Sequence, residues 1–173
     1  MRRIALLLVA AAMAAGVVYT AHALGQAGGA STPAYVTKMP AGYRDFRFIS
    51  VAHEAGNLNS LGAMLGNDVA FRAFREGTLP YPDGTIIAAL HYRNSPSAEN
   101  DRIFGQPQSF VPGAPTNIQF MIKDSTKYAA TGGWGFGFFT PEGKPMPAAA
   151  MKSCYPCHAR EKARDLVFTH YAP

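Results

Sequence analysis

Cysteine is scarce in this chain: its 173 residues contain two, Cys154 and Cys157. A zinc site built on them would need two more ligands at local spacing, and the sequence has none there. A thioredoxin-type cysteine pair opens a helix with a sheet still to come, but only 173 − 158 = 15 residues follow His158. The sequence therefore argues against both kinds of site.

Long apolar runs and blocks of one charge are missing as well. The longest apolar run, residues 4–15, is shorter than the ~20 apolar residues of a membrane-spanning helix. The formal net charge is +5, and no Lys/Arg block accompanies it. The sequence therefore predicts no nucleic-acid partner.

The short apolar run has the features of an export signal. Arg2 and Arg3 precede it, and small residues then lead to Ala21-His22-Ala23, an A-x-A cleavage site. We therefore predict that residues 1–23 are a signal peptide cleaved after Ala23, that the protein is periplasmic, and that no membrane attachment remains. Cleavage leaves 173 − 23 = 150 residues, the length of one ordinary domain.

What the chain does have is the motif C-x-x-C-H, formed by Cys154, Cys157 and His158. This is the attachment signature of a c-type haem. The two thiols form thioethers to the porphyrin, and the adjacent imidazole becomes the proximal ligand of the iron. We favour this interpretation over a structural disulfide, because export and covalent haem attachment agree with each other.

Four segments have the composition of β-strands. Alternation and aromatic or β-branched enrichment predict strands at residues 43–51, 85–92, 117–123 and 134–139. Residues 85–92 are apolar on both faces as far as His91, which is typical of a central strand. In residues 133–139 glycines alternate with aromatic side chains, so a haem edge, a helix or another backbone can approach the glycine face closely.

One longer helix is predicted from Val69 to Glu76, capped by Asn67 or Asp68 and ended by Gly77. The remaining segments are expected to be short helices at 124–130, 147–152 and 159–165, connections at 57–66 and 94–107, and a flexible lead at 24–40.

Together these elements predict an α+β fold, mainly an antiparallel β-sheet with a few short helices, in one haem c domain over residues 41–173. Small electron-transfer cytochromes carry the attachment motif near the N-terminus instead. Helical cytochromes c′ carry it near the C-terminus but form a four-helix bundle, which the predicted strands do not fit.

Several motifs in this order resemble the cytochrome P-460 family, which includes the sheet-rich cytochromes c′-beta. The resemblance spans nearly all of the mature chain. The segments that carry it are Tyr43-Arg44-Asp45-Phe46, Asp83-Gly84-Thr85, Lys123-Asp124-Ser125, Gly133-Trp134-Gly135-Phe136, the C-x-x-C-H motif, and Asp165-x-Val167-Phe168-Thr169.

The resemblance implies one covalent haem c whose iron has five ligands and an open face, in a periplasmic homodimer. It also implies hydroxylamine oxidation in the enzymes of the family, whose porphyrin is cross-linked to a lysine six positions after the Asp of the Asp-Gly-Thr turn. Counting from Asp83 reaches Ala89 here, and no lysine lies between Lys38 and Lys123. This departure bears on enzyme activity and leaves haem binding untouched.

Three functions remain open at this stage. The protein is a binder of NO, CO or another small ligand, a hydroxylamine or NO oxidoreductase that lacks the cross-link, or an electron carrier with a periplasmic redox partner. The catalytic residues stay unassigned. The electron carrier would need a sixth iron ligand, for which the candidates are Met64, Met121, His53, His91 and His170.

Overall fold

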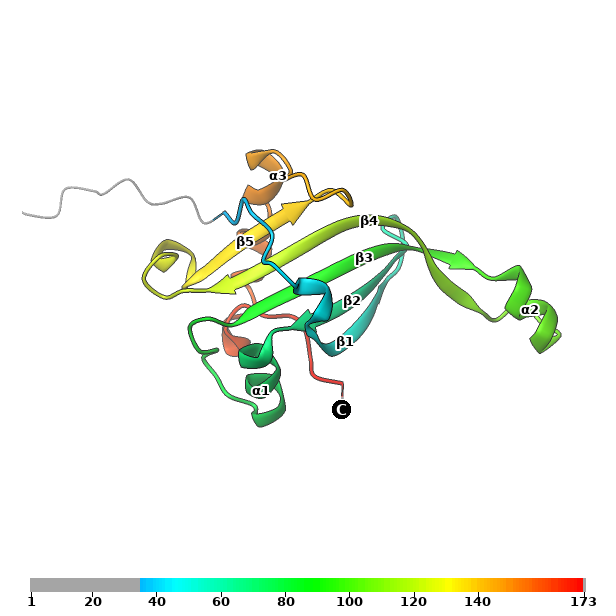
Figure 1. Ribbon diagram of the computed structural model, residues 1–173, viewed down its shortest axis with the longest axis horizontal. Coiled ribbons are helices and arrows are strands. Elements are labelled where there is room, and N and C mark those ends of the chain that lie inside the picture. Colours follow the sequence, from blue (N-terminus) through cyan, green and yellow to red (C-terminus); the bar gives the residue numbers. More distant parts are fainter. Residues whose placement is uncertain (1–34, 173) are drawn as a thin grey trace, which may run out of the picture. The chain divides into compact units, whose positions relative to one another are not determined.

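Within residues 35–172, which are the residues that the computed structural model describes, five antiparallel strands form one sheet in chain order (Figure 1). The strands are β1 (Arg47–Glu54), β2 (Ser60–Gly66), β3 (Ile86–Pro96), β4 (Phe110–Lys123) and β5 (Trp134–Phe139). This arrangement confirms the predicted α+β class with a mainly antiparallel sheet. The predicted signal peptide, residues 1–23, lies outside the described residues.

Short helices surround the sheet. They are η1 (Tyr43–Asp45), α1 (Asp68–Glu76), α2 (Ala98–Phe104), η2 (Ala129–Thr131), α3 (Ala148–Lys152), α4 (Cys154–His158) and η3 (Lys162–Arg164). Among the described residues, no helix has both the length and the apolar character needed to cross a membrane.

The predicted helix α1 is confirmed, including its ends. The Asn67 side chain accepts a hydrogen bond from the amide of Ala70 at 2.9 Å, which satisfies one of the free N–H groups of the first turn. The same oxygen accepts from the amide of Ile86 at 3.1 Å, so the cap also fixes the start of β3. Gly77 ends the helix with φ 66°.

The expected connection at residues 57–66 is wrong, because β2 occupies most of it. Glycine and alanine have low strand propensity, so the segment lacks a local strand signal. Its pairing with β1 and β3 supplies the stability instead. Packing requires the glycine at position 66, since a Cβ there would lie 2.8 Å from the Ala70 Cβ; at Gly62 the nearest atom is the mobile end of the Met64 side chain.

Three further expectations need correction. The predicted strand at 43–51 begins only at Arg47, and a 3-10 turn precedes it. The predicted loop at 94–107 contains α2, which Ser97 caps by accepting a hydrogen bond from the Asn100 amide at 3.3 Å. The predicted helices at 124–130 and 159–165 are reduced to the 3-10 helices η2 and η3, each followed by a left-handed residue, Gly132 and Asp165.

β3 and β4 continue beyond the neighbouring strands as a two-stranded arm that carries α2 (Figure 1). The arm exposes three large apolar side chains, Ile103, Phe104 and Phe110. It lies away from the part of the sheet that packs against the other helices.

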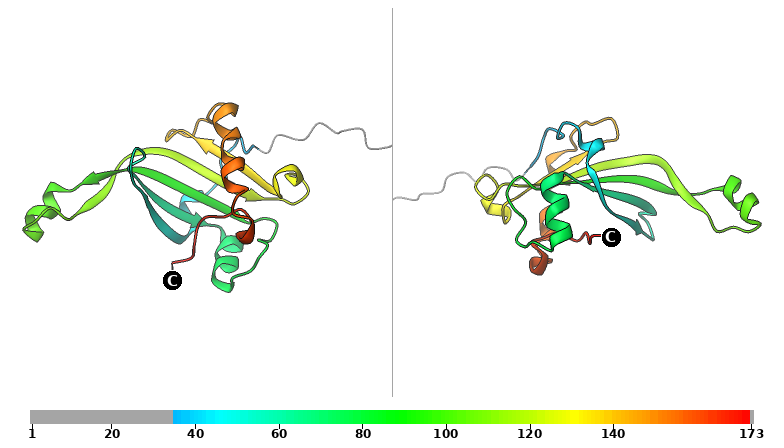
Figure 2. Two further views of the ribbon diagram at one scale, coloured as in Figure 1. Left: turned by 180° about the vertical axis from the view of Figure 1, so that it is seen from behind. Right: turned by 60° about the horizontal axis from the view of Figure 1, so that its bottom comes forward.

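The two faces of the sheet are covered by different parts of the chain (Figure 2). One face packs against the N-terminal segment that contains Val36, Met39 and η1. The other packs against α1 and the C-terminal segment that contains α4. Because side chains alternate along a strand, β3 sends Ala88 and Leu90 to the first face and Ile87 and Ala89 to the second.

The glycine face of β5 is covered by protein. The ring of Tyr128 occupies the space beside Gly135. Val36 packs over Gly137, where an added Cβ would lie 3.1 Å from the valine Cβ, and its amide donates to the Phe136 carbonyl at 2.7 Å. Of the approaches expected for this face, that of a second backbone is observed at Gly137, whereas the Tyr128 ring at Gly135 was not predicted.

Candidate functional site

The cysteine motif lies on the short helix α4, and a helical turn precedes it, as the sequence predicts. Pro147 precedes α3, and Ser153 joins α3 to α4. In α4 the thiols of Cys154 and Cys157 are three positions apart, which places them on one side of the helix. Both thiols are free, Cys154 half-buried and Cys157 exposed. Burial raises the pKa of the Cys154 thiol, and the neighbouring Cys157 adds to the effect.

His158, the last residue of α4, is held in a defined orientation. Its Nδ1 lies 2.8 Å from the backbone carbonyl of Leu166. A carbonyl only accepts, so Nδ1 carries the proton and Nε2 keeps its lone pair. The ring also lies between Phe168, at 4.5 Å between centroids, and Phe136, at 5.1 Å.

The electrostatics of His158 favour the neutral imidazole that metals bind. Burial lowers the pKa of this imidazole, while the hydrogen bond to Leu166 acts in the opposite direction. A neutral ring with its second nitrogen oriented by a backbone hydrogen bond is the usual arrangement of a metal-ligating histidine.

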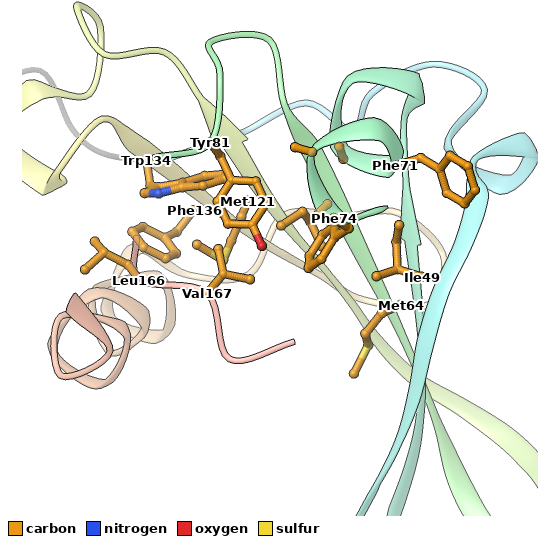
Figure 3. Close-up of a cluster of buried hydrophobic side chains, with 13 residues drawn as sticks. Ile49, Met64, Phe71, Phe74, Tyr81, Met121, Trp134, Phe136, Leu166 and Val167 are labelled. Carbon is orange, nitrogen blue, oxygen red and sulfur yellow. The ribbon is translucent and has the colours of Figure 1, made fainter. Parts of the chain in front are cut away.

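A cavity of about 420 Å³ lies between this motif and the sheet. Cys154 and His158 line it on one side, and side chains from all five strands line it on the other. Figure 3 shows part of the adjoining core, with Val167 of the C-terminal segment beside Tyr81 and Met121. The cavity walls are mainly apolar, as in most cofactor sites.

One polar group projects from β3 into this cavity. His91 lines it and is buried, with Nδ1 3.3 Å from the Ser60 hydroxyl and 3.9 Å from a Glu54 carboxylate oxygen. Burial lowers the pKa of the His91 imidazole, and the negative charge of Glu54 opposes this. The ring is therefore neutral near pH 7, and among the described residues its Nε2 has no hydrogen-bond partner.

A comparison with known protein families matches residues 40–169 to cytochrome P460. The match covers most of the chain. The chain belongs to the cytochrome P460 family. No curated protein matches it closely enough to serve as a relative.

Membership in the cytochrome P460 family implies haem c, and the residues present fit that group. Two thiols at the attachment spacing, a neutral imidazole with a free Nε2, and an apolar cavity adjoin one another. Cys154 and Cys157 would hold the porphyrin, and His158 would ligate the iron.

Ala89, which stands where the cytochrome P-460 resemblance places the cross-linking lysine, lies on the cavity floor. Its neighbours across the strands are Met64 on β2 and Gln119 on β4, and both line the same cavity. A longer side chain at this position would extend into the cavity. The count from the Asp-Gly-Thr turn therefore leads to a cavity-facing position, where this chain has a methyl group.

The structure brings four of the five candidate sixth ligands to the cavity: Met64, Met121, His91 and His170 all line it. His53 does not, since it lies elsewhere on β1 with Nε2 3.1 Å from the Asn94 side chain. Ser60 and Glu54, which contact His91, were not anticipated from the sequence. For Glu54 the signal was its spacing from Ser50 and Ala52, at alternate positions of one strand.

Proposed function

We propose that this protein is an exported mono-haem c cytochrome with an accessible iron face that binds NO or another small nitrogenous ligand. The observation that carries the proposal is the apolar floor of the cavity, where Ala89 takes the place of a long amine. The bound haem supplies an iron coordination position that a diatomic molecule can take. The chain supplies the axial imidazole and a dry environment.

Each part of the chain around the cavity has a distinct task in this proposal. His158 holds the iron, and the rings of Phe136 and Phe168 keep its imidazole in place. Met64, Ile87 and Met121 supply most of the apolar surface on the sheet side, beside the polar His91 and Gln119, and this surface disfavours anionic ligands. Neutral ligands such as NO and CO suit this environment better than charged ones.

One observation favours a second function, the oxidation of hydroxylamine or NO. Hydroxylamine must lose protons when it is oxidised, and a neutral imidazole is the side chain best suited to accept one near pH 7. His91 is such a group, and Ser60 and Glu54 hold its Nδ1 side, which leaves Nε2 toward a ligand. Because Ala89 cannot form the cross-link, we favour ligand binding over oxidation as the function.

The proposal includes a location and partners. Arg2, Arg3 and the cleavage signal at Ala21-His22-Ala23 support export to the periplasm. The resemblance supports a homodimer, which light scattering of the haem-loaded protein tests directly. A periplasmic redox partner is needed only by the oxidoreductase and electron-carrier alternatives.

An optical spectrum of the purified ferrous protein, with and without NO or CO, tests the proposal. We expect a high-spin ferrous haem that binds either gas without displacing a strong protein ligand. A low-spin spectrum in both oxidation states would instead support the electron carrier. The replacements His91→Ala and Met121→Ala would then identify the sixth ligand.

A further inference from the structure

A buried ion pair lies behind the haem-binding histidine. The ammonium group of Lys123, at the end of β4, is 2.8 Å from both carboxylate oxygens of Asp165. The side chains are 7% and 15% exposed, so solvent screens the pair weakly. Lys123 also donates to the Gly132 carbonyl at 3.1 Å and lies 4.9 Å from the centre of the Trp134 ring.

Asp165 makes a third polar contact that ties two more parts of the chain together. One of its carboxylate oxygens accepts a hydrogen bond from the Tyr81 amide at 2.9 Å. The carboxylate therefore joins the C-terminal segment to the end of β4 and to the segment before β3. Its charge and its hydrogen bonds are both matched, as a buried ion requires.

The backbone at Asp165 has a strained conformation, and the next residue forms the hydrogen bond to the axial histidine. Asp165 and Leu166 have φ angles of 50° and 66°, which place two consecutive non-glycine residues in the left-handed region. Such a conformation persists only where surrounding contacts impose it. It directs the Leu166 carbonyl to Nδ1 of His158, at 2.8 Å.

We propose that Lys123 and Asp165 are positioning residues for the proximal histidine: they fix the left-handed turn that presents the Leu166 carbonyl to His158, and so set the electron donation of the imidazole to the iron. A hydrogen bond at the second ring nitrogen raises the basicity of a metal-bound imidazole. The strength of the iron–histidine bond and the reduction potential then depend on an ion pair that contacts neither the haem-binding thiols nor the imidazole. This inference rests on haem ligation by His158, which is part of the proposed function, and not on the choice between gas binding and oxidation.

The test is resonance Raman spectroscopy and redox titration of the haem-loaded Asp165→Asn protein. Asparagine keeps the size of the side chain and an acceptor for the Tyr81 amide, but it loses the charge that Lys123 pairs with. We expect the iron–histidine stretching band of the ferrous protein to move to lower frequency and the reduction potential to rise, because the imidazole becomes a weaker donor. Lys123→Arg retains the charge, and we expect it to give values nearer to those of the parent protein.

Asp83→Asn is the matched control. Asp83 accepts from the amide of Ser125 at 2.8 Å and from its hydroxyl at 2.6 Å, so it also joins the turn before β3 to the chain after β4. It makes no hydrogen bond or ion pair with Asp165 or Leu166, and its charge acts on Lys123 only from a distance. Its replacement is expected to lower stability while leaving the iron–histidine band in place. An equal shift in the control and in Asp165→Asn would overturn the inference.

If Asp165→Asn leaves an unpaired ammonium that prevents haem loading, the double replacement Lys123→Met with Asp165→Asn gives the same comparison without a buried charge. An unchanged band and potential in the haem-loaded variant would mean that the Phe136 and Phe168 rings alone orient His158, and would overturn the inference. The absence of an iron–histidine band from the parent protein is a different failure, because it would remove the proposed ligation itself.

Discussion

The two faces of the sheet are made by the same strands, yet one is filled and the other is hollow. On the filled face Phe120 is 2% exposed and packs edge-to-face against Tyr43 and Phe139, with ring centroids 5.2 and 5.7 Å apart. On the hollow face Ala89 lines the cavity. Cavities of this size cost stability unless a ligand fills them, so the difference marks the face that is built for a cofactor.

The alternation of β3 and β4 produces this difference one residue at a time. Phe120 fills one face and Met121 borders the cavity on the other. On β3, Ala88 is fully covered by protein while Ala89 faces the cavity. A single strand therefore serves stability and ligand binding with alternate side chains.

The largest effect on the difference between the two faces is expected from removing the covalent attachment of haem on the hollow face. We expect the Cys154→Ala and Cys157→Ala double variant to release all of its haem into acidified acetone, because no thioether remains. The parent protein should retain its haem under the same extraction. Release of free haem from the parent protein would contradict covalent haem attachment.

His158→Ala is the control for that experiment. The thioethers can still form in this variant, so its haem should resist extraction while the native axial bond is lost. The electronic spectrum then separates attachment from ligation.

The next largest effect is expected in the free energy of unfolding, when two neighbouring residues of β4 are replaced in turn. Phe120→Ala should lower the free energy of unfolding by ~3–5 kcal/mol, because it opens a void in the filled face. Met121→Ala should cost about 2 kcal/mol, at the low end for methionine, because the removed atoms already border a cavity. Denaturant titration of the haem-loaded proteins provides both values. Equal costs would mean that the two faces do not differ in packing.

Ala89→Lys tests how the hollow face controls the haem. The parent protein should show an ordinary c-type Soret band, without the red-shifted ferrous band of the cross-linked family members, and should turn over hydroxylamine slowly. Lysine at this position places an amine in the cavity and is expected to raise turnover if the cross-link forms, since macrocycle distortion changes haem reactivity. Ala89→Met is the control of similar length without an amine. Rapid hydroxylamine turnover by the parent would contradict the binding proposal.

The smallest effect concerns pH and the buried His91 on the hollow face. Because burial lowers the pKa of His91 in the folded state, the unfolded chain takes up a proton first as the pH falls below about 6.5. Folding stability therefore falls with decreasing pH through this range, and above it His91 makes no pH-dependent contribution. His91→Gln should flatten the curve of unfolding free energy between pH 7.5 and pH 5. Identical slopes for the two proteins would show that His91 does not titrate in this way.

The sequence predicts the fold class and the attachment motif because both depend on local patterns. Alternation predicts β5 and the second half of β4, and the C-x-x-C-H spacing marks α4 as the expected haem-attachment helix. It does not predict β2, because two glycines and an alanine weaken its strand signal; the segment becomes a strand by pairing on both sides.

The contacts that orient the site depend on chain topology, which local patterns do not contain. Lys123 and Asp165 are 42 positions apart, and their pairing follows from the return of the C-terminal segment to the end of β4. The contact of Ser60 with His91 likewise requires β2 to lie beside β3. Ala89 is the exception, because a count from the Asp-Gly-Thr turn leads to a cavity-facing position.

The last described residues of the chain reach the edge strand of the sheet. The Ala172 amide donates to the Ile49 carbonyl at 3.0 Å, so the chain that follows α4 pairs with β1 at one position. An uncovered edge strand is a template for strand addition by a second molecule, and β1 also exposes Phe48 and Val51. The segment that orients His158 therefore also covers one backbone acceptor on this edge strand.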